Sequence, residues 1–457
     1  MGFSKQLAEK IVALDEGHLD DSVMLEIKRG MVDVVGVTLA GSLEGCAKIA
    51  LLSVGGGKGA PAQIIGSNAR AAVLDAATVN GTAAHALDFD DCNNAMGGHP
   101  SAPAFAAVAA LAEDLNVSGV ETMLAYLAGY ETEVQMGPGL HPHHYNKGWH
   151  PTATFGTFGA AAAGAKLLKL DVEQTATALG IACSLAAGIK ANFGTMVKPL
   201  HVGQSARNGL FAAILAKNGF DASPEAFEHK QGFFEVFNGS GTYQSEKILE
   251  GWGAPFTIMN PGLAIKQHPC CGGTHTAVDA MLALRDKHDL TPDTVAKIES
   301  WTHQCRMAHT DRPNPRSELE GKFSVQYCMS RALMHGEVKM EHFENGAVHD
   351  ADARAVLAKV TSEEHQNEGV FQAIVAVTTT DGKRFEQNVD MAEGRGANQL
   401  SQEKLKRKFD NTAARALPAE RVAQAYETIM TLDEVASFRA LSGLLASSVN
   451  TVEQAAE

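Results

Sequence analysis

Small and hydrophobic residues recur at helical spacing through the first 265 residues of the chain. Alanine and glycine return at positions i, i+3 and i+4, and this spacing lets neighbouring helices approach closely and bury one face each. The clearest of these segments are residues 22–41, 69–89, 102–115, 119–134, 156–170, 172–189 and 204–220. The pattern predicts an all-α helical bundle.

After Pro269 the pattern changes to the alternation typical of strands. Residues 295–303 and 371–390 are β-rich, and the Asp381-Gly382 pair predicts a hairpin with a type I′ turn. Helical segments are expected at residues 276–289, 324–336 and 352–364. These elements together predict a small α+β unit.

Helical spacing returns from residue 400, and Ser401 is the expected N-cap of the first helix there. The simplest topology lets this tail rejoin the first helices. We therefore predict a mainly α protein, in which residues 1–266 and 400–457 form a large all-α helical-bundle domain and residues 267–399 form a smaller inserted α+β domain.

Length and charge narrow the class of protein. A chain of 457 residues exceeds the usual limit for a single core, so two domains are expected. No apolar stretch reaches membrane-spanning length, and the N-terminus has the pattern of an amphipathic helix rather than of an export signal. The seven cysteines lack the C-x-x-C spacing of zinc sites, which indicates reduced thiols. We expect a cytoplasmic protein.

The formal net charge of −15 disfavours binding to nucleic acid or to an anionic membrane surface. An anionic substrate must then be attracted locally, by a few cations in a cleft.

Residues 85–103, HALDFDDCNNAMGGHPSAP, concentrate acidic and histidine side chains around a Gly-Gly turn. If HALDFDD ends a helix, then His85, Asp88, Asp91 and Cys92 share one face, and the turn can fold His99 back toward them. Such a cluster suits proton transfer.

Two other interpretations of this cluster are open. Its acids and histidines are an acceptable ligand set for Zn²⁺ or Mg²⁺, although an aspartate-rich magnesium motif needs a carboxylate where this chain has Asn94. The segment can also be a solvated acidic helix end with a capping role. We expect no metal here.

Five further loop-like segments carry reactive groups, and loops commonly present functional side chains. They are residues 141–152 with Tyr145 and His150, 196–209 with Lys198, His201 and Arg207, 265–280 with Lys266, His268 and Cys271, 311–327 with Lys322 and Tyr327, and 393–401 with Arg395. Cations gathered beside acids and histidines are costly unless they bind something.

These motifs, in this order and at these separations, resemble the MmgE/PrpD family. HALDFDD, GHPSAP, GWHPT, VKPLHVGQSARNG, IKQHPCCGGTH, KFSVQY and GRGANQLS carry the resemblance over residues up to about 405. The family includes 2-methylcitrate dehydratase, cis-aconitate decarboxylase and iminodisuccinate epimerase. The resemblance implies a helical domain, a smaller α+β domain, a homodimer, no metal, no organic cofactor and an active site between the domains.

Carried over residue by residue, the family's pocket falls on nine positions. They are Asp88, Cys92, His99, His150, Lys198, His201, Lys266, Cys271 and Tyr327. The chain departs from the pattern in four respects, one of which is that Gln399 replaces a common Pro. Cys92 stands where members often have Thr, Cys271 takes the place of a histidine that the decarboxylase uses, and the loop after Cys92 is one residue longer than in the decarboxylase.

The departures favour a reaction other than decarboxylation. We expect Asp88, His99, Tyr145, His150, Lys198, Lys266 and Cys271 to be catalytic, and Cys92, His201, Arg207, His268, Lys322 and Tyr327 to bind substrate. The leading hypothesis is a cofactor-independent epimerase acting on a small di- or tricarboxylate. A hydro-lyase of the 2-methylcitrate dehydratase type is the alternative, followed by a decarboxylase of the cis-aconitate type and a non-catalytic polycarboxylate-binding protein.

Overall fold

The computed structural model describes residues 2–55, 57, 59–365, 369–396 and 398–447. The chain divides into two compact units, a helical unit of Met1–Ile265 with Ser401–Glu457 and an inserted unit of Lys266–Leu400. The division falls one residue outside the predicted boundaries of the inserted domain at each end. Each unit is described by itself.

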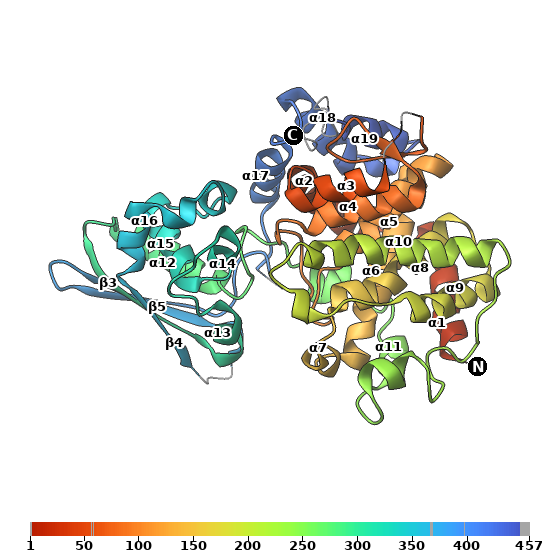
Figure 1. Ribbon diagram of the computed structural model, residues 1–457, viewed down its shortest axis with the longest axis horizontal. Coiled ribbons are helices and arrows are strands. Elements are labelled where there is room, and N and C mark those ends of the chain that lie inside the picture. Colours follow the sequence, from red (N-terminus) through yellow and green to blue (C-terminus); the bar gives the residue numbers. More distant parts are fainter. Residues whose placement is uncertain (1, 56, 58, 366–368, 397, 448–457) are drawn as a thin grey trace. The chain divides into compact units, whose positions relative to one another are not determined.

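The helical unit is built mainly of helices, and long loops also connect some of them (Figure 1). Its helices are α1 (Phe3–Ala13), α2 (Asp21–Gly41), α3 (Gly45–Val54), α4 (Val73–His85), α5 (Ser101–Leu115), α6 (Gly119–Leu140), α7 (His143–Lys147), α8 (Pro151–Leu167), α9 (Val172–Leu185), α10 (Val197–Lys217), α11 (Ser245–Glu250), α17 (Gln402–Ala413), α18 (Ala419–Met430) and α19 (Arg439–Leu444). A small hairpin joins β1 (Ala62–Gln63) to β2 (Arg70–Ala71).

Small residues set the spacing between the central helices, as the sequence predicts. Every residue of α8 except Lys166 is buried. An added Cβ at Gly81 of α4 would lie 2.8 Å from the Cα of Gly203 in α10, and one at Gly156 of α8 would lie 2.8 Å from the ring of Pro103 in α5. These helices can pack this closely only because glycine occupies the contact points.

The C-terminal tail returns to the helical unit through buried polar contacts. Ser401 caps α17 by accepting a hydrogen bond from the backbone N–H of Lys404 at 3.2 Å, which confirms the predicted cap. In α17, Lys408 places its Nζ 2.5 Å from Oδ1 of the buried Asp33 in α2. The tail is therefore part of the core.

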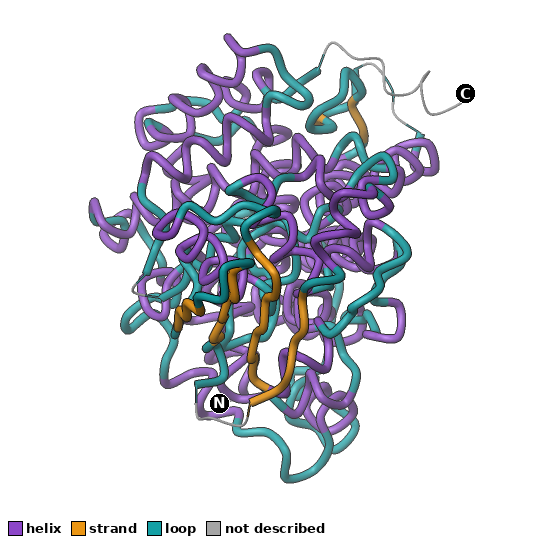
Figure 2. The backbone as a smooth tube through the Cα atoms, turned by 90° about the vertical axis from the view of Figure 1, so that its left-hand side faces the viewer, coloured by secondary structure: helices purple, strands orange, loops and turns teal. Residues whose placement is uncertain are grey.

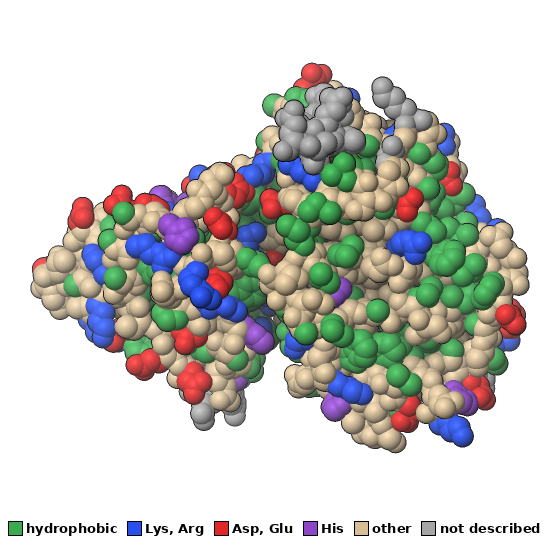
Figure 3. Space-filling view, viewed as in Figure 1, with side chains coloured by type: hydrophobic (Ala, Val, Ile, Leu, Met, Phe, Trp, Pro, Cys, Tyr) green, Lys and Arg blue, Asp and Glu red, His purple; other side chains and the backbone are tan. Residues whose placement is uncertain are grey.

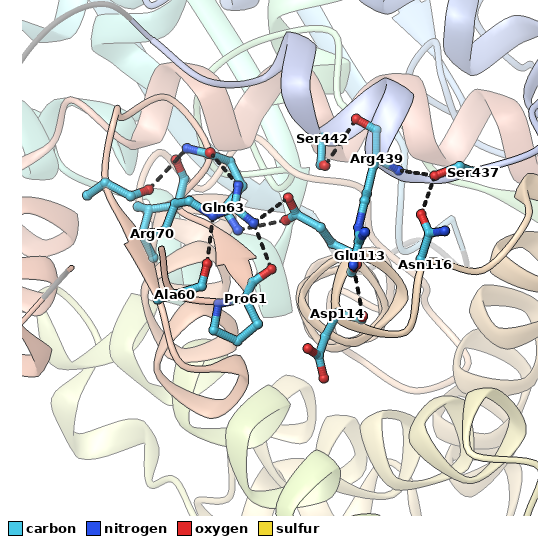
Figure 4. A network of polar contacts seen from close by, with 12 residues as sticks. Ala60, Pro61, Gln63, Arg70, Glu113, Asp114, Asn116, Ser437, Arg439 and Ser442 are labelled. Atoms are coloured by element: carbon cyan, nitrogen blue, oxygen red, sulfur yellow. Dashed lines mark hydrogen bonds and ion pairs between the residues drawn. The ribbon is translucent and has the colours of Figure 1, made fainter. Parts of the chain in front are cut away.

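A second polar network joins the end of α5 to both the small hairpin and the tail (Figure 4). The buried carboxylate of Glu113 accepts hydrogen bonds from the backbone N–H of Gln63 at 2.7 Å and from Arg70 at 2.8 Å. Arg439 of α19 donates to the backbone oxygen of Glu113 at 3.0 Å. The network satisfies polar groups at one end of α5.

Some apolar side chains of the helical unit stay exposed. Ile49, Met196 and Phe220 are 53%, 57% and 57% exposed, and hydrophobic side chains are also visible on the surface of this unit in Figure 3. Within the described ranges, no single helix has both the length and the apolar composition needed to cross a membrane, although the bent pair α2 and α3 passes that test together.

The inserted unit is an α+β structure with one four-stranded sheet, whose strands are drawn in orange, side by side, in Figure 2. Its elements are α12 (His275–His288), β3 (Val295–His303), α13 (Gln304–Thr310), α14 (Glu318–Lys322), α15 (Val325–His335), α16 (Ala351–Leu357), β4 (Val360–His365), β5 (Ala373–Thr379) and β6 (Arg384–Val389). The strand order is β4-β3-β5-β6, with β3 and β4 parallel and the other pairs antiparallel. Strand residues such as Val295, Val375 and Val377 pack with α12 and α15 in one hydrophobic core.

Two local predictions in this unit are wrong. The helix predicted over 352–364 ends at Leu357, and Val360–His365 forms β4 because its residues pair with β3. The hairpin after β5 is confirmed, but its turn is not type I′. Gly382 has a φ of +85°, but the φ of Asp381 is not positive. A type I′ turn needs both.

Candidate active site in the helical unit

The segment after α4 builds the cluster by leaving the helix, not by continuing it. α4 ends at His85, and Asp88 adopts the left-handed conformation with φ 53°. The chain then pairs at Cys92 with Ala264 through two backbone hydrogen bonds of 2.9 and 3.2 Å. The prediction that four residues share one helical face is therefore wrong.

The Gly-Gly turn folds His99 back onto this segment, as the sequence predicts. Gly97, with φ 68°, and Gly98 both donate backbone hydrogen bonds to the oxygen of Asn93. The backbone N–H of His99 donates to Thr152 Oγ1 at 3.1 Å. These contacts fix the imidazole ring beside the acids.

His99 lies among three groups that favour its charged form. Nε2 is 3.7 Å from Asp88 Oδ1, and Nδ1 is 3.4 Å from Asp90 Oδ2 and 3.7 Å from the sulfur of Cys92. Burial opposes the charge, but Cys92 and Asp90 together outweigh burial and raise the pKa of His99 to about 10. His99 is therefore a proton donor at neutral pH.

Lys198 stands in the first turn of α10 and reaches the same acid. Its Nζ donates to Asp88 Oδ1 at 2.6 Å, and it lies 5.5 Å above the ring of Phe193. The two side chains are 12% and 13% exposed, so the ion pair is largely shielded from solvent. A partly buried ammonium of this kind suits a substrate carboxylate or a developing negative charge.

His150 and His201 form a second histidine pair. His150 precedes α8, His201 lies one turn after Lys198, and their Nδ1 atoms are 3.2 Å apart. Burial lowers the pKa of both rings, and the charge of Lys198 lowers it further. Both rings are neutral at pH 7, so one can donate this hydrogen bond and the pair can accept a proton.

His85 and Asp90 complete the cluster. Both Asp90 oxygens lie within hydrogen-bond distance of His85 Nδ1, at 3.0 and 2.8 Å, and both side chains are fully buried. Burial lowers the pKa of His85 to about 4 despite the neighbouring acid. Burial opposes the charge of Asp90, but His85 and His99 hold its pKa well below the usual range.

Four of these residues bring ligand atoms within 4.8 Å of one another, namely His85, Asp88, Asp90 and His99. The same acids already have cationic partners, because Lys198 contacts Asp88 and the charged ring of His99 lies between the two carboxylates. A cation would have to displace both positive charges. We assign no metal to the cluster.

Two other predicted residues of the helical unit are Tyr145 and Arg207. Tyr145 in α7 has the Lys190 ammonium 3.2 Å above its ring, and its ring lies 6.0 Å from that of His141. Arg207 contacts Asn208 and lies 5.8 Å from the ring of Phe211. It follows Lys198 by nine residues, or two and a half helical turns, so it lies on the opposite face of α10. The role of Arg207 in substrate binding stays a prediction.

The inserted unit contains four more of the predicted residues, namely Lys266, His268, Cys271 and Lys322. Cys271 donates its backbone N–H to the oxygen of Lys322 at 2.9 Å, and the buried Lys266 lies near Gly272. His268 bonds to Asp279 at 2.8 Å; burial lowers the pKa of this histidine, but Asp279 raises it by more.

Tyr327 is fully buried in the core of the inserted unit. Its hydroxyl donates to the backbone oxygen of His342 at 2.6 Å and accepts from Arg331 Nε at 2.9 Å. The side chain is held by these contacts, and its role as a substrate contact stays a prediction.

The sequence hypothesis missed the roles of His85 and Asp90 in the final cluster. The motif includes His85, but nothing in it distinguishes Asp90 from Asp91. Only the path of the chain after Asp88 directs Asp90 toward the histidines and Asp91 toward the backbone N–H of Ser101, at 3.2 Å.

Comparison with known proteins agrees with the motif resemblance. Residues 5–246 match the MmgE/PrpD N-terminal domain, and residues 268–434 match the MmgE/PrpD C-terminal domain. The cis-aconitate decarboxylase of Mus musculus is 29% identical, with 97% of this chain and 93% of the relative covered. The cis-aconitate decarboxylase of Homo sapiens is 28% identical, with 97% of this chain and 94% of the relative covered. That of Aspergillus terreus is 28% identical, with 84% of this chain and 83% of the relative covered. The chain therefore belongs to the MmgE/PrpD family, whose members are enzymes.

Proposed function

We propose that this chain is a cofactor-independent enzyme that moves protons at a carbon next to a carboxylate of a small di- or tricarboxylate, and that the reaction is an epimerisation. One observation carries the proposal. The cluster of the helical unit holds a charged histidine, His99, and a neutral pair, His150 and His201, on either side of the buried His85.

An acid and a base in one cluster suit a reaction with two proton transfers. Removing a proton from carbon needs a neutral acceptor, and returning one needs a charged donor. Decarboxylation generates the same carbanion by losing CO₂, so it needs only the donor. Epimerisation and dehydration use both groups.

The carbanion formed beside a carboxylate needs fixed positive charge, because no cofactor is proposed to delocalise it. Lys198 supplies an ammonium in the helical unit. Lys266 and Arg395 are buried cations of the inserted unit, 3% and 7% exposed. We infer that Lys198 holds a carboxylate of the substrate in the helical unit, in a protein whose overall charge of −15 would otherwise repel it.

A lyase reaction is the second candidate, and the names of the relatives favour it, since the mouse and human proteins are cis-aconitate decarboxylases. At 28% and 29% identity, the reaction type can differ between relatives. Cys271 stands at the position that the decarboxylase's histidine occupies in our motif comparison, which favours epimerisation over decarboxylation.

Reaction in D₂O separates the candidates. With iminodisuccinate or a similar amino-dicarboxylate, we expect deuterium at the α-carbon of the inverted product and no new alkene signal by NMR. Formation of 2-methylaconitate from 2-methylcitrate would instead support a hydro-lyase, and formation of itaconate and CO₂ from cis-aconitate would support a decarboxylase. Either result without exchange into the amino-dicarboxylate would refute the epimerase proposal.

Matched variants test the residues. Lys198→Ala and Lys266→Ala should each lower kcat/KM by about a hundredfold or more, as expected for a charged contact that strengthens in the transition state. Lys406→Ala is the control, because Lys406 is 43% exposed and pairs with Asp410 within α17, and this variant should leave kcat/KM within about twofold of wild type. Equal effects of all three variants would contradict the assignment of the site.

A further inference from the structure

We propose that Asp90 is the positioning residue of this site, because its single buried carboxylate holds the Nδ1 atoms of both His85 and His99 and so fixes which ring nitrogens remain for the reaction. The inference rests on the proposed function for its catalytic meaning. The orientation and the protonation of the two histidines do not depend on which substrate the enzyme uses.

The geometry places one carboxylate between two rings. Asp90 Oδ2 lies 2.8 Å from Nδ1 of His85 and 3.4 Å from Nδ1 of His99. The two rings are T-shaped with centroids 4.6 Å apart. Because Asp90 faces the Nδ1 atom in both cases, the Nε2 atom of each ring points away from it.

Only one of the two rings can be charged. Two imidazolium ions 4.6 Å apart would repel each other, and one carboxylate compensates one positive charge. His99 has Asp88 and Cys92 as further partners, whereas His85 is fully buried and lies near the charge of Lys198. The pKa is accordingly raised to about 10 for His99 and lowered to about 4 for His85.

His85 is then neutral, with its hydrogen on Nδ1 and a lone pair on Nε2. That Nε2 atom is buried and has no hydrogen-bond partner among the residues that the structure describes. The titratable groups around the two rings come from three places: Asp88, Asp90 and Cys92 from the segment after α4, His150 from the start of α8, and Lys198 and His201 from α10.

Asp91 provides a matched control next to Asp90 in the chain. It is also fully buried, but its Oδ1 accepts from the backbone N–H of Ser101 at 3.2 Å and does not contact a histidine. Burial, together with the charge of Asp33, raises the pKa of Asp91 well above its usual range. An asparagine there replaces a carboxyl group whose partner is a backbone N–H, and it leaves the carboxylate between the two rings in place.

The test compares Asp90→Asn with Asp91→Asn in the full-length protein labelled with ¹⁵N-histidine, with the His99 signal assigned from His99→Gln. We expect Asp90→Asn to lower the pKa of His99 by about one to three pH units, as removal of an adjacent opposite charge does. It should lower kcat by about a hundredfold or more with little change in KM, and the rate should fall at a correspondingly lower pH. Asp91→Asn should leave the pKa of His99 and kcat close to wild type.

The ¹⁵N shifts of the wild-type protein keep the proposal testable if Asp90→Asn does not fold. Neutral His85 should carry its hydrogen on Nδ1, and His99 should carry hydrogens on both nitrogens at pH 7. A hydrogen on Nε2 of His85, or an equal fall in the pKa of His99 in both variants, would overturn the role of Asp90. If no polycarboxylate reacts, the proposed function fails, while the histidine signals still decide whether Asp90 positions the two rings.

Discussion

Gly81→Ala tests whether the close approach of α4 and α10 sets the geometry of the cluster. α4 ends in His85, one turn after Gly81, and α10 carries Lys198 and His201. An added Cβ at Gly81 would meet only backbone atoms of α10, with Gly203 Cα at 2.8 Å and the oxygen of Val202 at 3.1 Å. Backbone atoms cannot rotate away, so the helices themselves must separate.

The size of the effect follows from these distances. Ordinary contact begins at 3.4 Å, so the helices must part by about 0.6 Å at this point. Overpacking of this kind costs about 1–3 kcal/mol, and the better helix propensity of alanine returns about 1 kcal/mol. A misplacement of about 1 Å can cost about a hundredfold in rate, so we expect kcat/KM to fall by about tenfold. The tenfold fall in rate, which is about 1.4 kcal/mol, should therefore accompany a net loss of stability of about 0–2 kcal/mol.

The assay combines urea unfolding with the rate of deuterium incorporation into the substrate. Gly443→Ala is the control, because an added Cβ there meets no atom within 4 Å. It should keep both stability and rate close to wild type. A Gly81→Ala protein with normal rate and normal stability would refute the argument that this contact sets the distance between His85 and the α10 side chains.

Three further predictions follow. Lys408→Met leaves the buried Asp33 without its cation, so it should lower the free energy of unfolding, measured by urea denaturation, by about 3–5 kcal/mol. Lys406→Met is the control, because it removes only an exposed ion pair and should change that free energy by less than about 1 kcal/mol. The thermal midpoint should be highest near pH 6.5. The raised pKa of His99 gives stability that is complete below pH 6.5 and is lost as the pH rises toward 10. The lowered pKa of His85 gives stability that is complete above pH 6.5 and is lost as the pH falls toward 4. His99→Gln should remove the loss on the alkaline side. Activity should survive exhaustive treatment with chelators, and stoichiometric metal lost together with activity would contradict the metal-free mechanism.

The sequence by itself determined the mainly helical character, the α+β texture of residues 295–390, the Ser401 cap and the family. These features are local or periodic, so a short window of residues contains the signal. The reaction motifs were also visible, since His99, His150, Lys198 and His201 do gather with Asp88 in the helical unit.

Only the tertiary structure decided how the side chains of each motif are used. The run Asp88, Phe89, Asp90, Asp91 contains no glycine or proline to mark the break after His85, yet Asp88 turns left-handed and sends the next two acids to different partners. Asp90 lies as a carboxylate between two histidines that hold its pKa low, while burial raises the pKa of Asp91 in the core. Identical residues differ here because burial and neighbouring charges act through space, and those neighbours come from helices far apart in the chain.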